Sequence, residues 1–534
     1  MKFRRIFILF LTAFTLTVAS CGKDDPVKPA DIVTPDDDKK DDGGKKSELT
    51  VSGNVMDTDG KPFVGAVISD GRKCTVTDEK GYYEFERNRY ATFITCSIPS
   101  DAVIECSGNY NMPCSHYQNV TNGKKTYDFT YRRQASEKRF RFLGLGDCQV
   151  GKDTHIERFK NETIADVRKL LNENEAVPTY AITLGDNVNN TWELFPDIAK
   201  VIGQCPVPLF STIGNHDHEF VSGGQSDELA RKKYEATFGP SSYSFNRGDC
   251  HIVSMDNVYH GASAVGDYSA GFEKFQYEWL KQDLELTDKS KMVILCVHIP
   301  FKNGFSTSDV KIGSAEILQL LSQFSSAIIV SGHTHNIQTN WTNSVNGKTI
   351  PEYVVGATCG AWWSGTICGT GDPNGYNVFE LDGTKIIDEY FKSSQLPRSF
   401  QMTMMRPKDF PDFNSNDITF RFSSTDADYI YVHAFNFRKW TLTLYEDGVA
   451  TATSKTVSSD YNMWAKYYYY KKDKLGKDNY TGKTNRMVKF KLKNPDAKDI
   501  KVEAVDAYGN TYVVDKFITQ DNYPQDYSTL KLYE

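Results

Sequence analysis

Five apolar runs in this 534-residue chain end on residues of the kinds that bind metal ions. Strands of an open α/β sheet present their chemistry at one edge, so side chains that follow several strand ends are expected to meet in space. Carboxylate, amide and imidazole groups are ligands for divalent ions such as Mn, Fe and Zn. We therefore predict a metal site. The runs are "RFRFLGLGDCQ" with Asp147 and Gln149, "TYAITLGDNVNN" with Asp186 and Asn189, "VPLFSTIGNHDH" with Asn215, His216 and Asp217, "KMVILCVHIP" with His298, and "SAIIVSGHTHN" with His333 and His335.

The five runs fall within residues 138–393, where strand-like and helical stretches alternate. In "HIERFKNETIADVRKLLNEN" the apolar positions recur at helical spacing, and further helices are expected near 226–238, 273–285 and 314–323. A chain of this length exceeds what one core supports, so flanking domains are also expected. The region 138–393 is predicted to be an α/β domain in which helices cover two buried sheets.

All-β domains are predicted on either side of this region. Residues 49–135 alternate short strands with Asp-Gly and Lys-Gly turns, and residues 394–534 return to the same alternation. The first pattern, G-x-V, D-G-x-P-x-x-G-A-x-V and T-D-x-x-G-x-Y-x-F, resembles the carboxypeptidase-regulatory-like β-sandwich. In the second, the aromatic run "NMWAKYYYYKK" at 462–472 is interpreted as alternating strand faces or as a ligand-stacking patch.

The N-terminus resembles the signal of a bacterial lipoprotein. In residues 1–20 a basic start precedes a short apolar run and small residues, and Cys21 follows. Residues 21–48 are rich in charge, Pro and Gly and are predicted to be a disordered tether. We expect an exported lipoprotein, anchored in a membrane through lipid at Cys21, on the periplasmic face or at the cell surface. A plain signal peptide is the alternative.

The net charge of the chain limits the classes of partner. A formal charge of -7 argues against a nucleic-acid partner, which would need a basic surface. A small phosphorylated substrate would instead have to be attracted locally, for example by bound metal ions.

The order of the five motifs, D-x-(H/Q), G-D-x-x-(D/N), G-N-H-(D/E), H and G-H-x-H, resembles the calcineurin-like metallophosphoesterase family. The resemblance implies a β-sandwich flanked by helices, and phosphoester hydrolysis by a hydroxide that bridges two divalent ions (Mn, Fe, Mg or Zn). It also implies that Asp186 bridges the ions, with Asp147, Gln149 and His335 at the first and Asn215, His298 and His333 at the second. Whether phosphomonoesters or phosphodiesters are cleaved is left open.

Two positions of the resemblance bear on mechanism. His216 would be the catalytic residue that protonates the leaving oxygen, and Asn189 stands where the family often has an acid that supports this histidine. Gln149 replaces the commoner histidine. As a neutral, harder ligand it is expected to favour Mn, Mg or Fe over Zn. The alternative is that Gln149 lies behind the ligands and one ion binds weakly.

Further candidates are assigned to the border of the site or to substrate contact. Asp217 extends the G-N-H motif, Asp256 ends a strand, and His260 lies in a Gly- and Ala-rich stretch. Trp362 and Trp363 lie in the Gly-rich "GATCGAWWSG", where one of them would stack on a substrate ring, or both would cover an interface with the C-terminal sandwich.

Two functions from different classes remain. The first is a binuclear metal-dependent phosphohydrolase. The second is a non-catalytic surface lipoprotein that binds glycans or protein partners on the same scaffold. The second would not need His216 beside a full set of ligands, so the sequence favours the enzyme.

Overall fold

The computed structural model describes residues 47–173, 176–219, 226–260, 268–303, 311–339, 341–410, 413–414, 419–420, 428–469 and 481–519. Ser47–Glu534 form one compact unit. Within the described ranges, no helix has both the length and the apolar character needed to span a membrane. The signal segment, Cys21 and the tether up to residue 46 lie outside the described residues, so the predictions made for them stay predictions.

The first central sheet contains three of the predicted strands. Its order is β12-β11-β10-β23-β24, with β10, β11 and β12 parallel and β23 and β24 antiparallel to their neighbours. The strands are β10 (Arg139–Leu145), β11 (Thr179–Leu184), β12 (Leu209–Thr212), β23 (Gly375–Asp382) and β24 (Lys385–Ser393).

The second central sheet contains the other two predicted strands, β18 and β20. Its order is β13-β14-β18-β20-β22-β21, in which β14, β18, β20 and β22 run parallel. The strands are β13 (Tyr243–Arg247), β14 (Cys250–Ser254), β18 (Met292–Cys296), β20 (Ser326–Ser331), β21 (Thr342–Val345) and β22 (Lys348–Val354). Two short ribbons lie beside it, β15 (Val258–Tyr259) with β16 (Ser269–Ala270), and β17 (Phe272–Glu273) with β19 (Lys311–Ile312).

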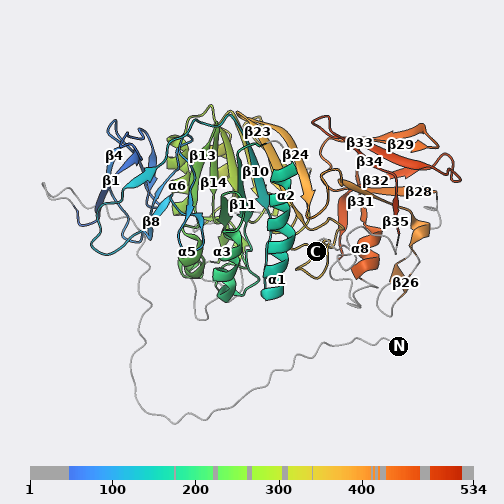
Figure 1. Cartoon of the computed structure of the whole chain (residues 1–534), viewed down its shortest axis with the longest axis horizontal. Coiled ribbons are helices and arrows are strands. Elements are labelled where there is room, and N and C mark those ends of the chain that lie inside the picture. Colours follow the sequence, from blue (N-terminus) through green and yellow to red (C-terminus); the bar gives the residue numbers. More distant parts are fainter. Residues whose placement is uncertain are drawn as a thin grey trace, which may run out of the picture. The chain divides into compact units, whose positions relative to one another are not determined.

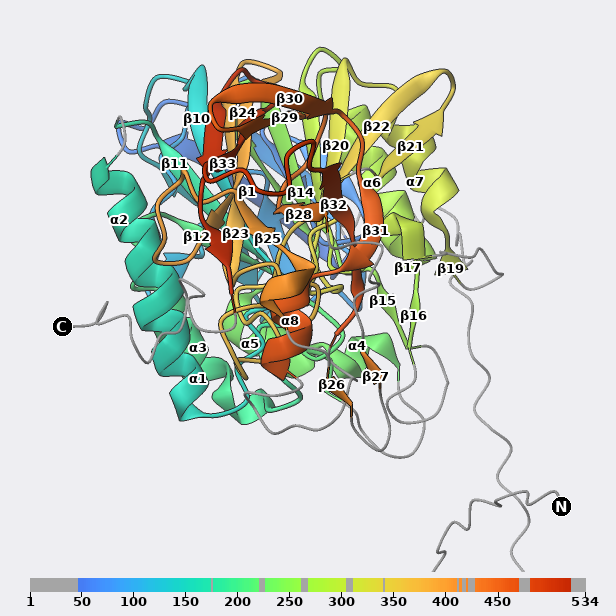
Figure 2. The same cartoon turned by 90° about the vertical axis from the view of Figure 1, so that its right-hand side faces the viewer.

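Helices cover the outer face of each sheet, as the sequence predicts (Figures 1 and 2). Beside the first sheet lie α1 (Asp153–Arg158), η1 (Phe159–Ile164), α2 (Ala165–Glu173), η2 (Trp192–Leu194), α3 (Phe195–Ile202) and α5 (Lys232–Phe238), and the short α4 (Asp227–Ala230) directly precedes α5. Beside the second lie α6 (Lys274–Glu285), η3 (Phe301–Asn303) and α7 (Ser314–Leu321). The expected helices near 226–238, 273–285 and 314–323 are confirmed.

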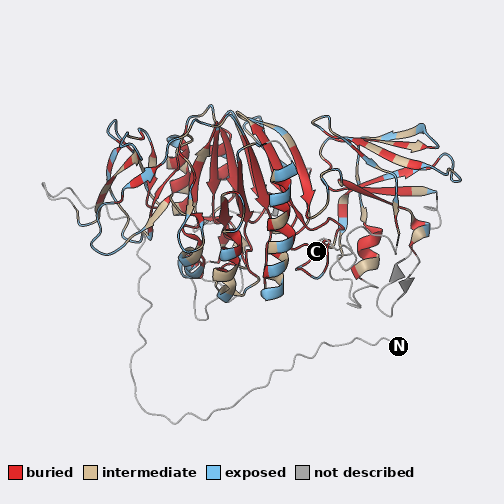
Figure 3. Cartoon of the chain, in the orientation of Figure 1, coloured by how far each residue is buried: buried red, intermediate tan, exposed pale blue. Residues whose placement is uncertain are grey.

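The strands alternate their side chains between two cores, because successive residues of a strand point to opposite faces. Along β18, Ile294 faces the core between the sheets and Leu295 faces α6 and α7. Along β10, Phe142 faces the core between the sheets and Leu143 faces the helices over the first sheet. Both faces of the inner strands β11, β14 and β18 are therefore buried (Figure 3), which fixes the register and the positions of the strand ends.

The N-terminal module is a small β-sandwich of sheets β4-β1-β9 and β3-β2-β5-β8, with a β6-β7 ribbon. Its strands are β1 (Thr50–Asp57), β2 (Val67–Ser69), β3 (Cys74–Val76), β4 (Tyr82–Glu86), β5 (Phe93–Cys96), β6 (Cys106–Ser107), β7 (Met112–Pro113), β8 (Tyr117–Asn119) and β9 (Phe129–Tyr131). Its apolar core is continuous with the core between the central sheets, and Ile98 pairs with Phe245 of β13. The module is thus packed directly onto the second sheet.

The C-terminal module is a second sandwich, of sheets β31-β32-β28-β25-β35 and β30-β29-β33-β34. Its elements are β25 (Met402–Met405), η4 (Pro407–Asp409), β26 (Phe413–Asn414), β27 (Thr419–Phe420), β28 (Tyr429–Ala434), β29 (Thr441–Glu446), β30 (Val449–Ser454), β31 (Ser458–Tyr461), α8 (Met463–Tyr467), β32 (Lys483–Lys491), β33 (Ile500–Val505), β34 (Thr511–Val514) and β35 (Phe517–Ile518).

The strand interpretation of the aromatic run at 462–472 is wrong over its described part, which forms α8. The Asn462 side chain accepts a hydrogen bond from the backbone N–H of Ala465 at 3.0 Å and so caps this helix. Met463, Trp464 and Ala465 are buried against the module, so these side chains build a core and do not form an exposed stacking patch.

A buried ion pair joins the C-terminal module to the central domain. Arg486 of β32 donates to both carboxylate oxygens of Asp372 at 2.8 and 2.6 Å, and both residues are almost fully buried. His433 Nε2 lies 3.3 Å from Asp372, and Thr370 Oγ1 lies 2.8 Å from both Asp372 and Asn336. Because Asn336 directly follows His335, the pair also holds the turn that carries a predicted ligand.

We expect the substitution Arg486→Met to lower the free energy of unfolding by about 3–5 kcal/mol, because it leaves the charged, buried Asp372 without its guanidinium partner. Urea denaturation followed by circular dichroism measures the change. The matched control is Lys200→Met, which breaks the surface pair with Asp197 and should change stability by less than about 1 kcal/mol. Equal effects of the two substitutions would contradict the assignment.

Candidate metal centre

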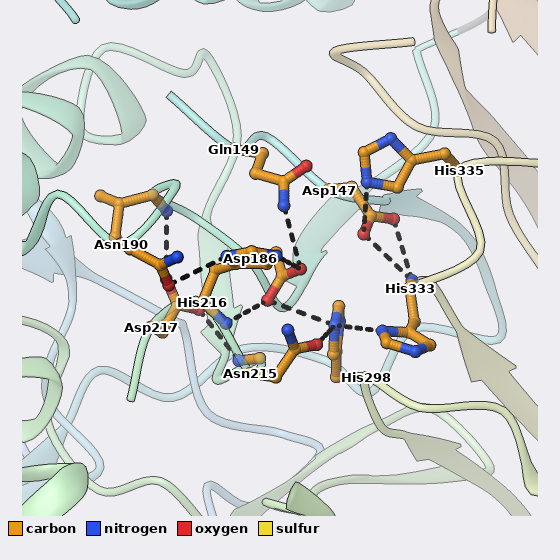
Figure 4. Close-up of polar contacts among 12 residues, drawn as sticks. Asp147, Gln149, Asp186, Asn190, Asn215, His216, Asp217, His298, His333 and His335 are labelled. Atoms are coloured by element: carbon orange, nitrogen blue, oxygen red, sulfur yellow. Dashed lines mark hydrogen bonds and ion pairs between the residues drawn. The ribbon is translucent and has the colours of Figure 1, made fainter. Parts of the chain in front are cut away.

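The five predicted strand ends converge at one place in the structure (Figure 4). The backbone turns sharply there, because five of the predicted ligands have positive φ angles, which are uncommon for residues other than Gly. These angles are 42° at Asp147, 41° at Gln149, 52° at Asp186, 69° at His333 and 57° at His335. Strained backbone of this kind is typical of functional sites.

Glycines in the motifs allow the segments to approach closely. A Cβ atom on Gly185 would lie 2.4 Å from Nδ1 of His298, and one on Gly214 would lie 2.3 Å from Oδ1 of Asp186. Both distances are shorter than any real contact of a Cβ atom, so larger residues at these positions would push the ligands apart.

Asp186 lies at the middle of the cluster. Its Oδ1 accepts a hydrogen bond from the backbone N–H of His216 at 2.8 Å and lies 3.2 Å from Nε2 of His298. Its Oδ2 lies 3.4 Å from Nε2 of Gln149. One carboxylate oxygen is thus turned toward each half of the predicted ligand set.

The predicted ligands of the second ion are assembled around His298. The Nε2 atom of His298 lies 2.9 Å from Oδ1 of Asn215 and 3.2 Å from Nδ1 of His333. Its other ring nitrogen, Nδ1, donates to the carbonyl of Leu184 at 2.7 Å, which leaves the Nε2 lone pair directed into the cluster. Ligand atoms of Asp186, His298 and His333 all lie within 4.8 Å of one another.

The predicted ligands of the first ion lie beside Asp147. The backbone N–H of His333 donates to this carboxylate at 3.0 and 3.1 Å, and Nε2 of His335 lies 3.6 Å from its Oδ1. His335 donates from Nδ1 to the carbonyl of Gly360 at 2.7 Å, so its Nε2 faces the cluster. His298 and His335 therefore each have the outer hydrogen bond that fixes a ligating imidazole.

Gln149 turns its amide nitrogen toward Asp186, and its Oε1 accepts from the thiol of Cys359 at 3.9 Å. The two ends of an amide have the same shape. A half-turn of the group would therefore direct Oε1 into the cluster and leave the nitrogen to donate to the Cys359 sulfur. The position of Gln149 thus permits ligation through oxygen.

The donor set fits divalent cations. Nδ1 of His298 is already a hydrogen-bond donor, so the lone pair of Nε2 faces oxygen atoms of Asn215 and Asp186. A proton or a metal cation between Nε2 and these oxygen atoms would stabilise the arrangement. Burial alone would lower the pKa of His298, but the carboxylate of Asp186 outweighs it and raises this pKa to about 9. Burial raises the pKa of Asp147 to about 6, and burial lowers the pKa of His333 to about 3. Acceptors crowded in this way are typical of metal sites.

His216 lies at the edge of the cluster, with Nε2 3.9 Å from Oδ2 of Asp186. Its Nδ1 donates to Oδ1 of Asn190 at 2.9 Å. The expectation that Asn189 supports His216 is therefore corrected to Asn190, because the backbone N–H of Asn189 pairs with Val150 and a φ of 55° at Asn190 turns that residue back. Burial lowers the pKa of His216.

Asp217 lies outside the cluster and supports its loops. The carboxylate is fully buried and accepts from the backbone N–H groups of Asn187, Val188 and Gly214 at 2.8 to 3.1 Å. Burial raises the pKa of Asp217 to about 7. It holds the Asp186 and Asn215 turns together.

Asp256 and His260 also lie one layer away from the ligands. Asp256 contacts Nε2 of His218 at 3.1 Å, and His218 donates from Nδ1 to the carbonyl of Gly214 at 2.9 Å. The ring of His260 packs 4.9 Å from that of His218. Neither candidate lines the pocket above the metal centre.

The two adjacent tryptophans have different positions. Trp363 is buried and donates from Nε1 to the carbonyl of Cys148 at 2.8 Å. Trp362 is 42% exposed, and its ring lies 4.7 Å from that of His335. Only Trp362 of the two lines the pocket.

A pocket of about 260 Å³ opens over the cluster. Sequence reasoning did not single out several of its lining residues, because they come from loops whose shape depends on packing. Besides Gln149, Asp186, Asn215, His216, His333, His335 and Trp362, the lining includes Tyr268, Thr334, Asn336, Cys368, Thr370 and Gly482. Thr334 and Asn336 could have been found from the sequence, because they are neighbours of the predicted ligands His333 and His335 in the motif "SGHTHN".

Comparison with known proteins assigns the family. Models for the calcineurin-like phosphoesterase, for the N terminal of calcineurin-like phosphoesterase and for the C terminal of calcineurin-like phosphoesterase match residues 140–336, 49–134 and 352–512. Together these matches cover most of the chain. The chain therefore belongs to the calcineurin-like phosphoesterase family, whose enzymatic class is that of phosphoric ester hydrolases.

Two individual proteins show similarity over different extents. Purple acid phosphatase 15 of Arabidopsis thaliana is 29% identical over 139 residues, which are 24% of this chain and 24% of that protein. The chain thus covers about a quarter of that relative's length. The purple acid phosphatase PPD1 from yellow lupin (Lupinus luteus) seeds aligns over 86% of this chain and 77% of its own, with 11% identity and a TM-score of 0.29.

We expect Asp186→Asn to abolish stabilisation by metal, because Asp186 faces both halves of the ligand set. Excess Mn²⁺ should raise the melting temperature of the unaltered protein, since a ligand that binds the folded state stabilises it. Differential scanning calorimetry with and without Mn²⁺ measures the shift. Asp197→Asn, at an exposed position, is the control. A shift that survives in Asp186→Asn would contradict the placement of the site.

Proposed function

We propose that this protein is a metal-dependent hydrolase of small phosphoesters that uses two divalent cations. The observation that supports the proposal is the convergence of Asp147, Gln149, Asp186, Asn215, His298, His333 and His335 with His216 beside them (Figure 4). A scaffold that only binds glycans or proteins would not need this histidine next to a complete ligand set.

The residues divide into two ligand groups that share Asp186. Asp147, Gln149 and His335 would hold one cation, and Asn215, His298 and His333 would hold the other. When bound, a pair of divalent ions neutralises the charge of the phosphate and lowers the pKa of water to near neutrality. The protein supplies the fixed geometry, since backbone carbonyls orient the imidazoles of His298 and His335.

His216 would donate a proton or hydrogen bond to the leaving oxygen. Its Nδ1 is bound to the neutral amide of Asn190, so Nε2 is the atom free to face substrate. An amide orients the ring without stabilising its charged form, and burial lowers the pKa of His216 further. A histidine of this kind is a weak base, which favours esters with good leaving groups.

Gln149 would select among metals. An amide oxygen is a harder ligand than imidazole, so we propose that the ion beside Gln149 is Mn, Mg or Fe in preference to Zn.

The membrane anchor at Cys21 and the exported location are proposals that rest on the signal-like N-terminus. The lack of a nucleic-acid partner is a proposal that rests on the net charge of -7.

The metal-loaded protein should hydrolyse bis-p-nitrophenyl phosphate, p-nitrophenyl phosphate or both, and should contain two ions per chain. Absorbance of p-nitrophenolate and atomic emission measure the two quantities. Which ester is faster decides between diesterase and monoesterase. Loss of turnover on chelation with recovery on adding Mn²⁺ supports metal dependence. No turnover of either ester by a protein shown to hold its metal would refute the enzyme, and one tightly held ion would refute the two-ion form.

We expect His216→Ala to lower kcat by about 10²–10⁴ on an ester with a poor leaving group, the usual range for loss of a general acid. The effect on p-nitrophenyl phosphate should be much smaller, because p-nitrophenolate leaves without protonation. Steady-state kinetics of both esters measure the difference. Asn190→Asp is a second variant to compare. A carboxylate next to Nδ1 should raise the pKa of His216, so the pH at which activity changes with the protonation of His216 should move to a higher value. Equal losses on both esters would contradict the assigned role.

A further inference from the structure

Two aromatic side chains line the pocket above the metal centre, each next to a different predicted ligand. Trp362 is 42% exposed and Tyr268 is 38% exposed, and both line the pocket. The Trp362 ring lies 4.7 Å from that of His335, and the Tyr268 ring lies 6.3 Å from that of His333. Each ring is therefore placed next to a ligand of a different ion of the proposed pair.

Trp362 is held in an unfavourable position. Its φ is 50° and that of Trp363 is 60°, so two successive bulky residues adopt the left-handed conformation. A large apolar ring left partly in solvent adds to this cost. Strained, exposed aromatic residues at the mouth of a site are best explained by a ligand that uses them.

The surrounding structure is built to keep this conformation. Trp363 is fixed by its Nε1 hydrogen bond to Cys148 and by its backbone N–H, which donates to Cys359 at 2.8 Å. Arg158 donates to the carbonyls of Trp363 and Gly365 at 2.5 and 3.0 Å. Arg158 is in turn paired with Glu162. The indole of Trp362 is thus presented to the pocket before any substrate arrives.

The remaining walls leave room for a flat group. Gly360, Ala361, Gly369 and Gly482 line the pocket, so much of the wall beside Trp362 is backbone. Among the lining residues that the structure describes, none is Lys or Arg. The phosphate charge is left to the cations and the histidines, and the part of the substrate beyond the phosphate meets neutral and aromatic surface.

We propose that Trp362 and Tyr268 bind a planar heteroaromatic ring of the substrate, so that the substrate class is a nucleoside phosphate or its ester. The proposal rests on the proposed phosphoesterase function and adds the group that the enzyme selects. Stacking on an aromatic side chain suits a base of any sequence, because every base has a π-face.

The test compares two esters that contain the same scissile bond. Adenosine 5′-monophosphate and ribose 5-phosphate are both primary phosphate esters of ribose and differ by the base alone. We expect kcat/KM for the nucleotide to exceed that for the sugar phosphate by about tenfold or more, the scale of one base–aromatic stack. Thymidine 5′-(p-nitrophenyl phosphate) against methyl p-nitrophenyl phosphate tests a diester, with the same p-nitrophenolate leaving group and a whole nucleoside in place of methyl.

Trp362→Asn removes the indole and retains a residue type that tolerates positive φ. It should lower the nucleotide-to-sugar ratio of kcat/KM several-fold, because the stacking contribution of the indole is lost while that of Tyr268 remains. Tyr268→Ala should lower the ratio as well. Trp362→Phe keeps a ring and should restore most of the preference. Tyr90→Ala, an exposed aromatic of the N-terminal module, should leave the ratio unchanged.

Calorimetric titration with adenosine, which has no phosphate, gives a readout that does not depend on turnover. Adenosine should bind the unaltered protein and bind Trp362→Asn at least tenfold more weakly, as loss of a stacking partner predicts. Equal turnover of the paired esters, or a ratio unchanged in both Trp362→Asn and Tyr268→Ala, would overturn the nucleoside assignment and leave the phosphoesterase standing. No turnover of any of the four esters by metal-loaded protein would overturn the phosphoesterase itself.

Discussion

The structure of the metal centre depends on holding carboxylate oxygens and imidazole nitrogens close together in the interior of the protein, although these atoms repel one another. Ligand atoms of Asp186, His298 and His333 lie within 4.8 Å of one another. Asn215 adjoins His298 and Asp147 adjoins His335, and burial removes the water that would otherwise solvate these groups. Two packed sheets, whose inner strands are buried on both faces, resist the separation that repulsion favours. Three other features also hold the ligands together. They are the backbone turns with positive φ, the close approaches at glycine and the hydrogen bonds that the buried Asp217 accepts from neighbouring turns. A cation relieves the repulsion, and the fold keeps the ligands in place until it binds.

Much of this arrangement could be predicted from the sequence, because the informative signal is local. An apolar run followed by Gly and a ligand residue predicts a buried strand and what lies at its end, and all five such runs form the expected strands. The finer contacts depend on tertiary geometry. Asn190 replaces Asn189 beside His216 because of one left-handed residue, and the amide orientation of Gln149 depends on Cys359, a residue 210 positions away. The run at 462–472 misled because its aromatic content suggested a strand, whereas the Asn462 cap starts a helix.

The C-terminal sandwich is part of the site as well as a flanking module. Gly482 lines the pocket, and Arg486 reaches from β32 to Asp372 behind the wall formed by Cys368 and Thr370. The hydroxyl of Thr370 contacts Asn336, the neighbour of His335. Substrate selection and ligand placement therefore depend on residues from both domains, and the N-terminal module contributes through the core that it shares with the second sheet.

The buried Arg486–Asp372 pair has a consequence for how such proteins diversify. A recombinant gene that joined this α/β domain to an unrelated sandwich would leave Asp372 without the guanidinium group of Arg486. It would also remove Gly482 from the lining of the pocket. The two sides of this boundary are therefore expected to change together, through paired substitutions.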